Sequence, residues 1–213
     1  MLPLPRRVLA RHAVVIACLL LFALLARQVL DEGPLTQVDR EVMLFMAAHR
    51  IAWVTQATLF LSMLHETGKV LGAAALIAAW LAWRHRKRWV VAMVVVPTGM
   101  LMNVGLKHLF QRARPAPDEP LVQLTTYSFP SGHGVASTVL YGVLGALLLA
   151  HVRSLPLRVL GTVACVAMVV AVCFSRVYLG AHYLSDVLAS VNIGTAWLLL
   201  WLGATRWVGA SRP

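Results

Sequence analysis

Residues 159–205, VLGTVACVAMVVAVCFSRVYLGAHYLSDVLASVNIGTAWLLLWLGAT, decide the fold of this chain. Two apolar runs without a charged residue, Val159–Phe174 and Val187–Thr205, flank a turn that is rich in polar side chains. Uncharged runs of this kind are typical of helices that cross a lipid bilayer. The stretch therefore predicts two transmembrane helices whose polar connection lies at one membrane surface.

The composition extends this interpretation to all 213 residues. Hydrophobic residues make up 60% of the sequence and charged residues only 13%, whereas a soluble domain is about half apolar and about a quarter charged. These figures also exclude a disordered chain. A net charge of +11 would suggest a nucleic-acid partner for a soluble protein, but apolar runs this long could not stay in water. We expect a single all-α integral membrane domain over residues 1–213, with no nucleic-acid partner.

Four other apolar runs bring the number of predicted spans to six. They are Ala13–Ala26 within an N-terminal transmembrane helix at residues 1–30, Thr67–Trp83, Trp89–Leu106 and Gly134–Ala150. Pro97 predicts a kink in the third span, which a neighbouring helix can accommodate.

The stretch between the first two spans is more polar. Thr36-Gln-Val-Asp39 fits a capping box that opens an amphipathic helix through about His49. Ile51–Leu64 is apolar but short, and it carries several hydroxyl and amide side chains. We interpret both segments as interfacial amphipathic helices that lie on one leaflet.

The distribution of charge fixes the orientation. With six spans and both termini in the cytoplasm, the inner segments are residues 1–12, 84–88, 151–158 and 206–213. They hold eleven of the nineteen Lys and Arg residues and none of the eight acidic ones, as expected for cytoplasmic loops. An alternative with Ile51–Leu64 as a seventh span would move the basic cluster Arg84–Arg88 to the opposite side, so six spans are favoured.

Three polar segments then meet at the outer membrane face. The third span ends in Gly-Leu-Lys107-His-Leu-Phe-Gln-Arg112-Ala-Arg114-Pro115, and the fourth opens with Phe129-Pro130-Ser131-Gly132-His133-Gly134. The connection between the last two spans reads Ser175-Arg176-Val-Tyr-Leu-Gly-Ala-His182-Tyr-Leu-Ser-Asp186. Because all three lie at span ends on one side, we expect their side chains to share one site.

The residue types in these segments suit a phosphoryl group. A helix that starts at Ser131-Gly132 offers free backbone N–H groups to an anion, and Lys107, Arg114 and Arg176 add three cations. Three cations with backbone donors match the several charged oxygens of a phosphate. Arg112 lies outside this pattern, and we expect it to anchor the chain at the membrane surface.

The histidines indicate the chemistry. His182 and Asp186 are four residues apart, so on a helix they share one face and the carboxylate can bind one ring nitrogen while the other acts as a nucleophile or a base. His133 would stand across the anion site, placed to protonate a leaving oxygen. With neither a carboxylate cluster for Mg²⁺ nor a zinc spacing in the sequence, these residues predict phosphoryl transfer without a metal or other cofactor, through a phosphohistidine.

The three patterns Lys107-x6-Arg114-Pro115, Pro130-Ser131-Gly132-His133 and Ser175-Arg176-x5-His182-x3-Asp186 resemble the tripartite signature of the type 2 phosphatidic acid phosphatase (PAP2) superfamily. The resemblance covers about residues 39–205 and implies the helical core that these enzymes share with vanadium haloperoxidases, which are soluble. It implies that His182 is the nucleophile, Asp186 its orienting partner and His133 the general acid. Lys107, Arg114, Ser131, Gly132 and Arg176 would bind the phosphate. The chain departs from the common pattern at Leu184, where Pro is usual, and at Ser190, where Gly is usual, and both positions concern helix packing.

The resemblance implies a lipid phosphatase of the cytoplasmic (inner) membrane with its site on the periplasmic or extracellular face. Undecaprenyl diphosphate, phosphatidylglycerophosphate and phosphatidic acid all fit as the lipid phosphate substrate. A lipid phosphotransferase that uses the same phosphohistidine is the main alternative. A transporter or flippase is less favoured, because it would predict paired broken helices and ionisable groups at mid-membrane. The sequence indicates no protein partner.

Overall fold

The computed structural model describes residues 6–116, 121–122 and 124–205, and every regular element in them is an α-helix. The helices of this part are α1 (Arg6–Leu30), α2 (Pro34–Ala48), α3 (Ala52–Leu64), α4 (Thr67–Trp83), α5 (Lys87–Met93), α6 (Val95–Phe110), α7 (Gly132–His151), α8 (Leu155–Tyr178) and α9 (Leu184–Ala204). The predicted inner segment with Arg206 and Arg212 lies outside the described residues.

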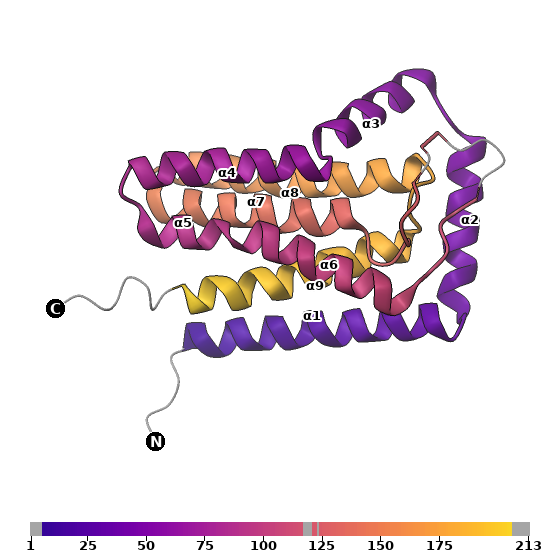
Figure 1. The fold of residues 1–213 in the computed structure, drawn as a ribbon, viewed down its shortest axis with the longest axis horizontal. Coiled ribbons are helices and arrows are strands. Elements are labelled where there is room, and N and C mark those ends of the chain that lie inside the picture. The colour runs from indigo at the N-terminus through magenta and orange to yellow at the C-terminus, as the bar shows by residue number, and fades with distance from the viewer. Residues whose placement is uncertain (1–5, 117–120, 123, 206–213) are drawn as a thin grey trace.

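The long helices form one bundle, as Figure 1 shows. Helix α7 packs against α6, α8 and α9, and α1 covers the free side of α9. Helix α2 crosses one end of the bundle and α3 leans outward beside it, whereas the N-terminal end of α1 and the C-terminal end of α9 lie at the opposite end (Figure 1). The fold therefore has one end built from short helices and loops and one end built from tight turns.

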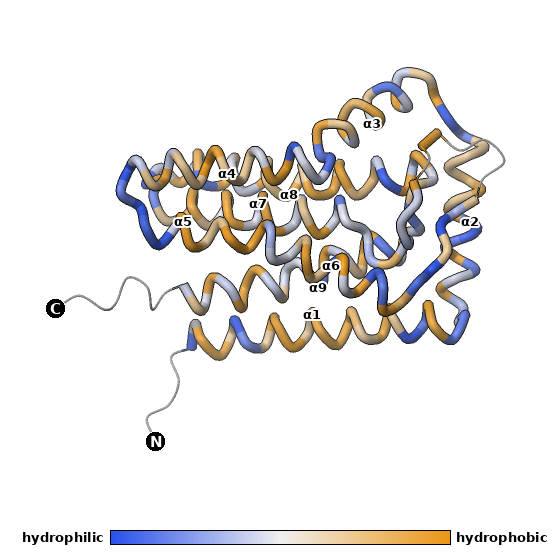
Figure 2. Tube along the Cα trace, in the orientation of Figure 1, coloured by the Kyte–Doolittle hydropathy of each residue, from blue (hydrophilic) through white to orange (hydrophobic). Residues whose placement is uncertain are grey.

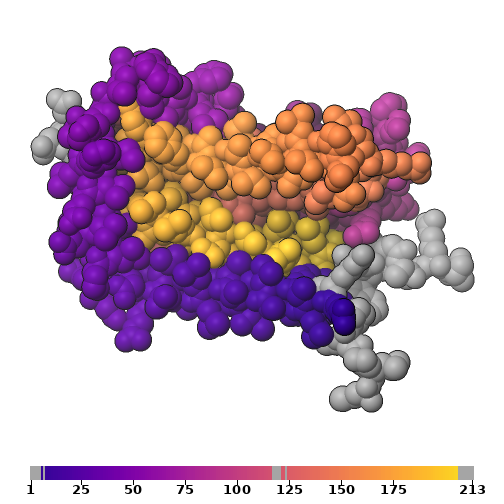
Figure 3. Space-filling view, turned by 180° about the vertical axis from the view of Figure 1, so that it is seen from behind, coloured from indigo at the N-terminus to yellow at the C-terminus, as the bar shows by residue number. Residues whose placement is uncertain are grey.

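The outward faces are apolar, which makes this a multi-pass membrane protein. Among the described residues, five stretches are long and apolar enough to cross a bilayer: Val8–Leu30, Lys87–Phe110, Gly132–His151, Leu155–Tyr178 and Leu184–Ala204. Hydrophobic residues run along the length of the bundle (Figure 2). Seen from behind, α1, α9 and α8 form one broad face that α2 closes at one end (Figure 3). In the apolar stretch of α8 only 6% of the residues are buried, against 44% in that of α7. Helix α8 therefore presents its side chains to lipid, while α7 forms the core.

The third predicted span is interrupted close to its proline. Helix α5 ends at Met93 and α6 begins at Val95, with the Val94 N–H turned back to the Val91 carbonyl at 3.2 Å. Pro97 has no N–H to offer the Met93 carbonyl and its ring crowds that group, so the helix must bend there. The Trp201 indole donates to the same Val91 carbonyl at 2.9 Å, and α9 thereby supports the break.

The predicted capping box at Thr36 and Asp39 is wrong. Helix α2 begins two residues earlier at Pro34, with Gly33 as its N-cap and without a side-chain cap. A proline at the first position suits a helix start because its missing N–H would be unpaired there in any case. The Thr36 hydroxyl instead donates to the Gly33 carbonyl at 2.8 Å, and Asp39 points into the bundle end, where it is fully buried.

Helices α7 and α9 approach closely through small residues, as membrane helices often do. A Cβ added to Gly134 would stand 1.9 Å from Ser190 Oγ, and one added to Gly142 would stand 2.2 Å from Leu198. The Ser190 hydroxyl already donates to the Val187 carbonyl at 2.6 Å, so it is held in that place. Glycine at position 134 is therefore required by serine at position 190.

We predict that Gly134→Ala lowers the unfolding free energy by about 1–3 kcal/mol through this overlap, and that Ser190→Gly in the same chain recovers most of the loss. Thermal unfolding of the four variants in detergent, treated as a double-mutant cycle, measures the coupling. Equal effects of Gly134→Ala in the wild-type chain and in the Ser190→Gly chain would contradict the contact.

Candidate active site

The residues of the three signature segments lie at the end of the bundle that α2 crosses (Figure 1). Lys107 is in the last turn of α6 and Arg176 in the last turn of α8, while Ser131 is the N-cap of α7. His182 lies in the connection before α9, and Asp186 is in the first turn of that helix. Elements far apart in the chain thus bring these side chains together at one level.

His182 and Asp186 contact each other as the spacing predicts, though not on a continuous helix. Helix α9 begins only at Leu184, so Asp186 is its third residue and accepts the Tyr183 N–H at 2.9 Å through Oδ2. The same oxygen lies 3.3 Å from His182 Nδ1 and accepts the Ser128 hydroxyl. The carboxylate therefore caps α9 and orients the imidazole at once.

The other imidazole nitrogen faces a cation. His182 Nε2 lies 3.3 Å from Arg114 Nη1, and the ring is 3% exposed. Burial is the main cause that lowers the pKa of His182 to about 3, and the nearby Arg176 and Arg114 contribute to the lowering against the opposing effect of Asp186. The ring is therefore neutral at physiological pH, with its proton on Nδ1 toward Asp186 and a free electron pair on Nε2.

Two cations hold the segment before α7. Arg114 donates to the Thr126 and Tyr127 carbonyls, at 2.5 Å and 3.2 Å, and to the Ala181 carbonyl at 2.7 Å. Lys107 Nζ donates to the Tyr127 carbonyl and, at 3.3 Å, to the Ser128 carbonyl. Neutral carbonyls leave both charges uncompensated, so the two side chains are held in place and remain attractive to an anion.

A third cation and the second histidine have free polar atoms. Arg176 is 2% exposed and donates through Nη1 to the Ser62 hydroxyl near the end of α3. The backbone of Ser62 also bonds to His133, which lies within electrostatic range of Arg176 and His182. In the part of the chain that the structure describes, Arg176 Nε and His133 Nε2 are buried without a hydrogen-bond partner. Such atoms are costly to bury, and an anion between them would satisfy both.

The start of α7 completes the anion site. Ser131 is fully buried, its N–H donates to the Asp186 carbonyl at 3.1 Å, and its hydroxyl accepts from the Gly134 N–H. Asn103 on α6 donates to the Pro130 carbonyl at 3.2 Å, and its Oδ1 would stand 3.3 Å from a Cβ on Gly132. Glycine keeps this approach open, and the first N–H groups of the helix have no acceptor within it.

Arg112 is not a membrane anchor, and that expectation is wrong. Its side chain is 11% exposed and bridges two fully buried carboxylates, with Nη1 2.6 Å from Asp186 Oδ1 and Nη2 2.7 Å from Asp39 Oδ2. Burial acts to lower the pKa of Arg112, but Asp186 and Asp39 raise it above its ordinary value. The guanidinium is a permanent part of the site's hydrogen-bond network.

Four further residues of the site, Asp39, Ser62, Ser128 and Asn103, were not predicted from the sequence. No local motif marks these residues, because each reaches the site from a different element. A signal was available only for Asn103, since an amide within an apolar span usually bonds a neighbouring segment. Within the part of the chain that the structure describes, no three His, Cys, Asp or Glu side chains are grouped as metal ligands.

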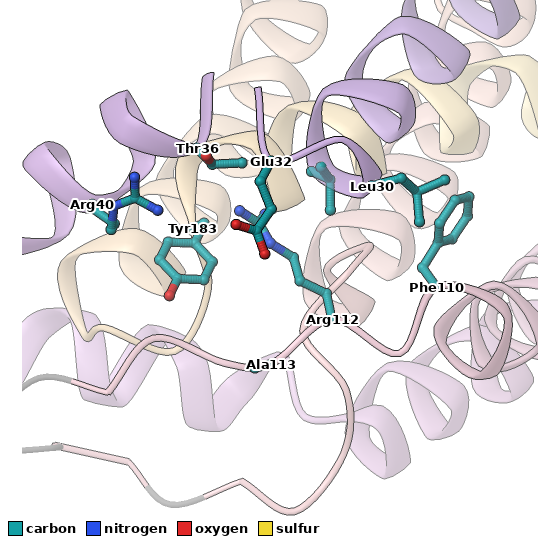
Figure 4. A pocket seen from close by; sticks show the side chains of 9 residues that line it. Leu30, Glu32, Thr36, Arg40, Phe110, Arg112, Ala113 and Tyr183 are labelled. Atoms are coloured by element: carbon teal, nitrogen blue, oxygen red, sulfur yellow. The ribbon is translucent and has the colours of Figure 1, made fainter. Parts of the chain in front are cut away.

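A cleft of about 350 Å³ opens beside the site, between the α1–α2 corner and the segment that follows α6. Figure 4 shows Arg112, Arg40 and Tyr183 on its polar side and Leu30 and Phe110 on its apolar side. The Arg112 guanidinium lies over the Tyr183 ring at 4.3 Å from the ring centre. The cleft therefore exposes the outer edge of the network that holds Asp186.

A multi-pass helical bundle whose polar end gathers two histidines, a carboxylate and a set of cations has the features of a membrane enzyme that handles phosphate. Comparison with known proteins agrees with this class. Residues 87–210 match the family model of the PAP2 superfamily. That match covers more than half of the chain, which therefore belongs to the PAP2 superfamily and is a phosphatase.

Named relatives share most of the length. Phosphatidylglycerophosphatase B of Bacillus subtilis is 29% identical over 180 residues, which cover 83% of this chain and 87% of the relative. The decaprenylphosphoryl-5-phosphoribose phosphatase of Mycobacterium tuberculosis is 33% identical over 125 residues, covering 56% of this chain and 63% of the relative. The crystal structure of a transmembrane PAP2-type phosphatidylglycerolphosphate phosphatase from Bacillus subtilis superposes with a TM-score of 0.81 at 27% identity, over 93% of this chain and 98% of that one.

We predict that the His182 ring stays neutral, with its proton on Nδ1, from pH 8 down to pH 5, because burial and the neighbouring cations hold its pKa near 3. Nitrogen chemical shifts of ¹⁵N-histidine-labelled protein in detergent measure the state of each ring, and His182→Asn assigns the signal. A His182 resonance that titrates with a midpoint near 6.5 would contradict the prediction.

Proposed function

We propose that this chain is a metal-independent lipid phosphatase that works at the outer face of the cytoplasmic membrane through a phosphohistidine on His182. One observation carries the proposal. His182 is bound at Nδ1 by Asp186 and faces Arg114 with Nε2, while the unpaired atoms of His133 and Arg176 lie close to it. We infer that a phosphoryl group binds between these atoms.

The first chemical step forms a covalent intermediate. The Nε2 electron pair of His182 attacks phosphorus in line with the bond to the leaving oxygen, so that an N–P bond forms as the P–O bond breaks. His133 gives its Nε2 proton to the leaving oxygen. The Asp186 carboxylate stabilises the positive charge that develops on the His182 ring.

The second step releases phosphate. His133, now neutral, takes a proton from a water molecule whose oxygen attacks phosphorus, and the N–P bond breaks with its electrons returning to His182. Inorganic phosphate leaves, and the proton stays on His133 for the next cycle. The same two histidines thus serve both halves of the reaction.

Fixed donors replace a metal ion in this scheme. Lys107, Arg114 and Arg176 bind the equatorial phosphate oxygens together with the Ser131 hydroxyl and the Gly132 N–H, and they stabilise the charge that these oxygens carry in both transition states. The first two cations are already held by backbone carbonyls and the third by Ser62. Little reorganisation is then needed when the substrate binds.

The substrate is a lipid phosphate or diphosphate. Relatives named as phosphatidylglycerophosphate phosphatases resemble this chain over most of its length, which favours phosphatidylglycerophosphate. The relative that acts on decaprenylphosphoryl-5-phosphoribose keeps undecaprenyl diphosphate as the next choice, ahead of phosphatidic acid.

The topology we propose has six spans and cytoplasmic termini. Helix α4 has 17 residues, about 26 Å at 1.5 Å per residue, and lies alongside the longer helices (Figure 1). The basic turn at Arg84–Arg88 is at the bundle end opposite the site, and basic loops favour the cytoplasm. Helices α2 and α3 then lie at the outer interface, and residues 1–213 form one domain.

We predict that detergent-purified protein releases phosphate from lipid phosphates in excess EDTA and that His182→Ala loses at least about 1,000-fold in kcat. Asp186→Asn should lose up to about 10⁴-fold, because the amide cannot hold the same ring tautomer. The substrates to compare are phosphatidylglycerophosphate, undecaprenyl diphosphate, phosphatidic acid and a soluble phosphomonoester.

The matched control is His49→Ala, since His49 is the exposed C-cap residue of α2 and its loss should leave kcat unchanged. Rapid alkaline quenching of the labelled reaction should trap acid-labile phosphate on the wild-type and His49→Ala chains and none on His182→Ala. Turnover retained by His182→Ala, or label passed to an acceptor lipid with none released to water, would overturn the proposal.

We predict that a cysteine at Thr125, in the segment before α7, reacts with a membrane-impermeant maleimide added to intact cells. A cysteine at His85, in the basic turn, should react only after permeabilisation. Both substitutions would be made in a chain whose Cys18, Cys165 and Cys173 are serine. The reverse labelling pattern would place the site in the cytoplasm and contradict the proposed face.

A further inference from the structure

Arg112 holds together two buried carboxylates that come from opposite ends of the chain. Asp39 lies on α2 and Asp186 on α9, and each is fully buried. The guanidinium bonds to Asp39 through Nη2 and to Asp186 through Nη1, at 2.7 Å and 2.6 Å. Nη1 also donates to the Ser185 hydroxyl at 2.7 Å. Removing these charged groups from water costs free energy. We therefore expect the network to serve the reaction as well as the stability of the fold.

Asp39 ties α2 to the start of α9. Its Oδ1 accepts the Ser185 N–H at 2.8 Å, and its Oδ2 accepts the Ser185 hydroxyl as well as Arg112. The Ser185 N–H belongs to the first turn of α9, where an acceptor is otherwise lacking, and a negative charge there is favourable. Asp39 also lies outside residues 87–210, which match the family model, so α2 supplies a contact from beyond that region.

The two oxygens of Asp186 have separate partners. Oδ1 accepts from Arg112, while Oδ2 accepts from Ser128 and the Tyr183 N–H and faces His182 Nδ1. Rotation of the carboxylate would break the bond on one side or the other, so Arg112 fixes the plane in which Oδ2 meets the imidazole.

The charges of the network leave one negative charge for the histidine. Asp39 and Asp186 carry two negative charges and Arg112 one positive charge, which Asp39 and Asp186 share through separate nitrogens. The remaining unit of negative charge is directed at His182 from the Nδ1 side. It opposes the cations on the Nε2 side and stabilises a positively charged ring.

We propose that Arg112 and Asp39 are positioning residues for the phosphatase reaction: they hold Asp186 so that it orients His182 for attack. This inference rests on the proposed function, since it takes His182 as the nucleophile. It makes α2 part of the catalytic apparatus, although no residue of α2 touches the phosphate site. The Tyr183 ring supports the arrangement because the Arg112 guanidinium lies over it, 4.3 Å from the ring centre.

Arg112→Lys and Asp39→Asn are the informative variants. A lysine keeps the charge but cannot reproduce two directed bonds from one planar group, and Asp39→Asn leaves a balanced Arg112–Asp186 pair. Neither variant strands an uncompensated buried charge, which would prevent folding. The matched control is Arg40→Gln, on the same helix and the same cleft but outside the network.

We expect each of the two variants to lower kcat by about 10- to 100-fold, the usual effect of losing a residue that orients a reactive histidine, with KM for phosphatidylglycerophosphate changed less than about threefold. Rates are measured on full-length protein in detergent and divided by the amount of folded protein recovered as a monodisperse peak in size-exclusion chromatography, so that unfolded molecules do not count. The double variant should lose less than the product of the single losses, since both act through Asp186.

The ¹⁵N signals of His182 separate positioning from simple stabilisation. The two variants should shift the ring from the single Nδ1–H tautomer toward a mixture, whereas Arg40→Gln should not. Lower thermal stability with unchanged kcat per folded molecule, or lower kcat with an unchanged His182 tautomer, would overturn the inference. If His182→Ala itself remains active, the proposed function fails; an inactive His182→Ala beside fully active Arg112→Lys and Asp39→Asn refutes the positioning role alone.

Discussion

A carboxylate buried at the end of a membrane bundle constrains everything around it. Asp186 has no contact with solvent, and an unpaired charge in such a place is too costly for a folded chain to carry. Its bonds to Arg112, Ser128, Tyr183 and His182 remove that cost. Each partner reaches Asp186 only if α6, α7 and α9 end at the same level, so the positions of these helix ends follow from the need to satisfy one anion.

The cations on the other side of His182 are balanced less completely. Lys107 and Arg114 donate to backbone carbonyls and Arg176 to a hydroxyl, none of which carries a negative charge. Like charges brought together in this way repel each other, and the fold offsets the repulsion with apolar packing along the rest of the bundle. A bound phosphate removes this repulsion. The free energy gained in this way contributes to the affinity of the site for the anion.

The positions of the apolar helices and the spacing of the signature residues could be predicted from the sequence because both are local. An apolar run identifies a span by itself, and the spacings that hold Lys107, Arg114 and His182 need no knowledge of the fold. The structure gathers these residues at one bundle end as their place at span ends indicated. The roles of Asp39 and Arg112 could not be predicted in this way, because they depend on a contact between two residues that are 73 positions apart along the chain. The local capping-box pattern predicted that Asp39 caps α2. In the structure its carboxylate instead points into the bundle, where it bonds to Arg112 and Ser185.

The two sides of His182 explain why a shared network matters for a single side chain. Negative charge lies on the Nδ1 side and positive charge on the Nε2 side, so the field runs along the line between the two ring nitrogens. That field holds the proton on Nδ1 and leaves the Nε2 electron pair directed at the cations, which is where an anionic substrate is drawn. An electric field depends on the positions of the charges that produce it. Any movement of Asp186 therefore changes the charge distribution of the His182 ring, even when every atom that would touch phosphate stays in place. Arg112 and Asp39 hold Asp186 on the side away from His182. They therefore affect the same N–P bond formation as His182 itself, although they are distant from it in sequence.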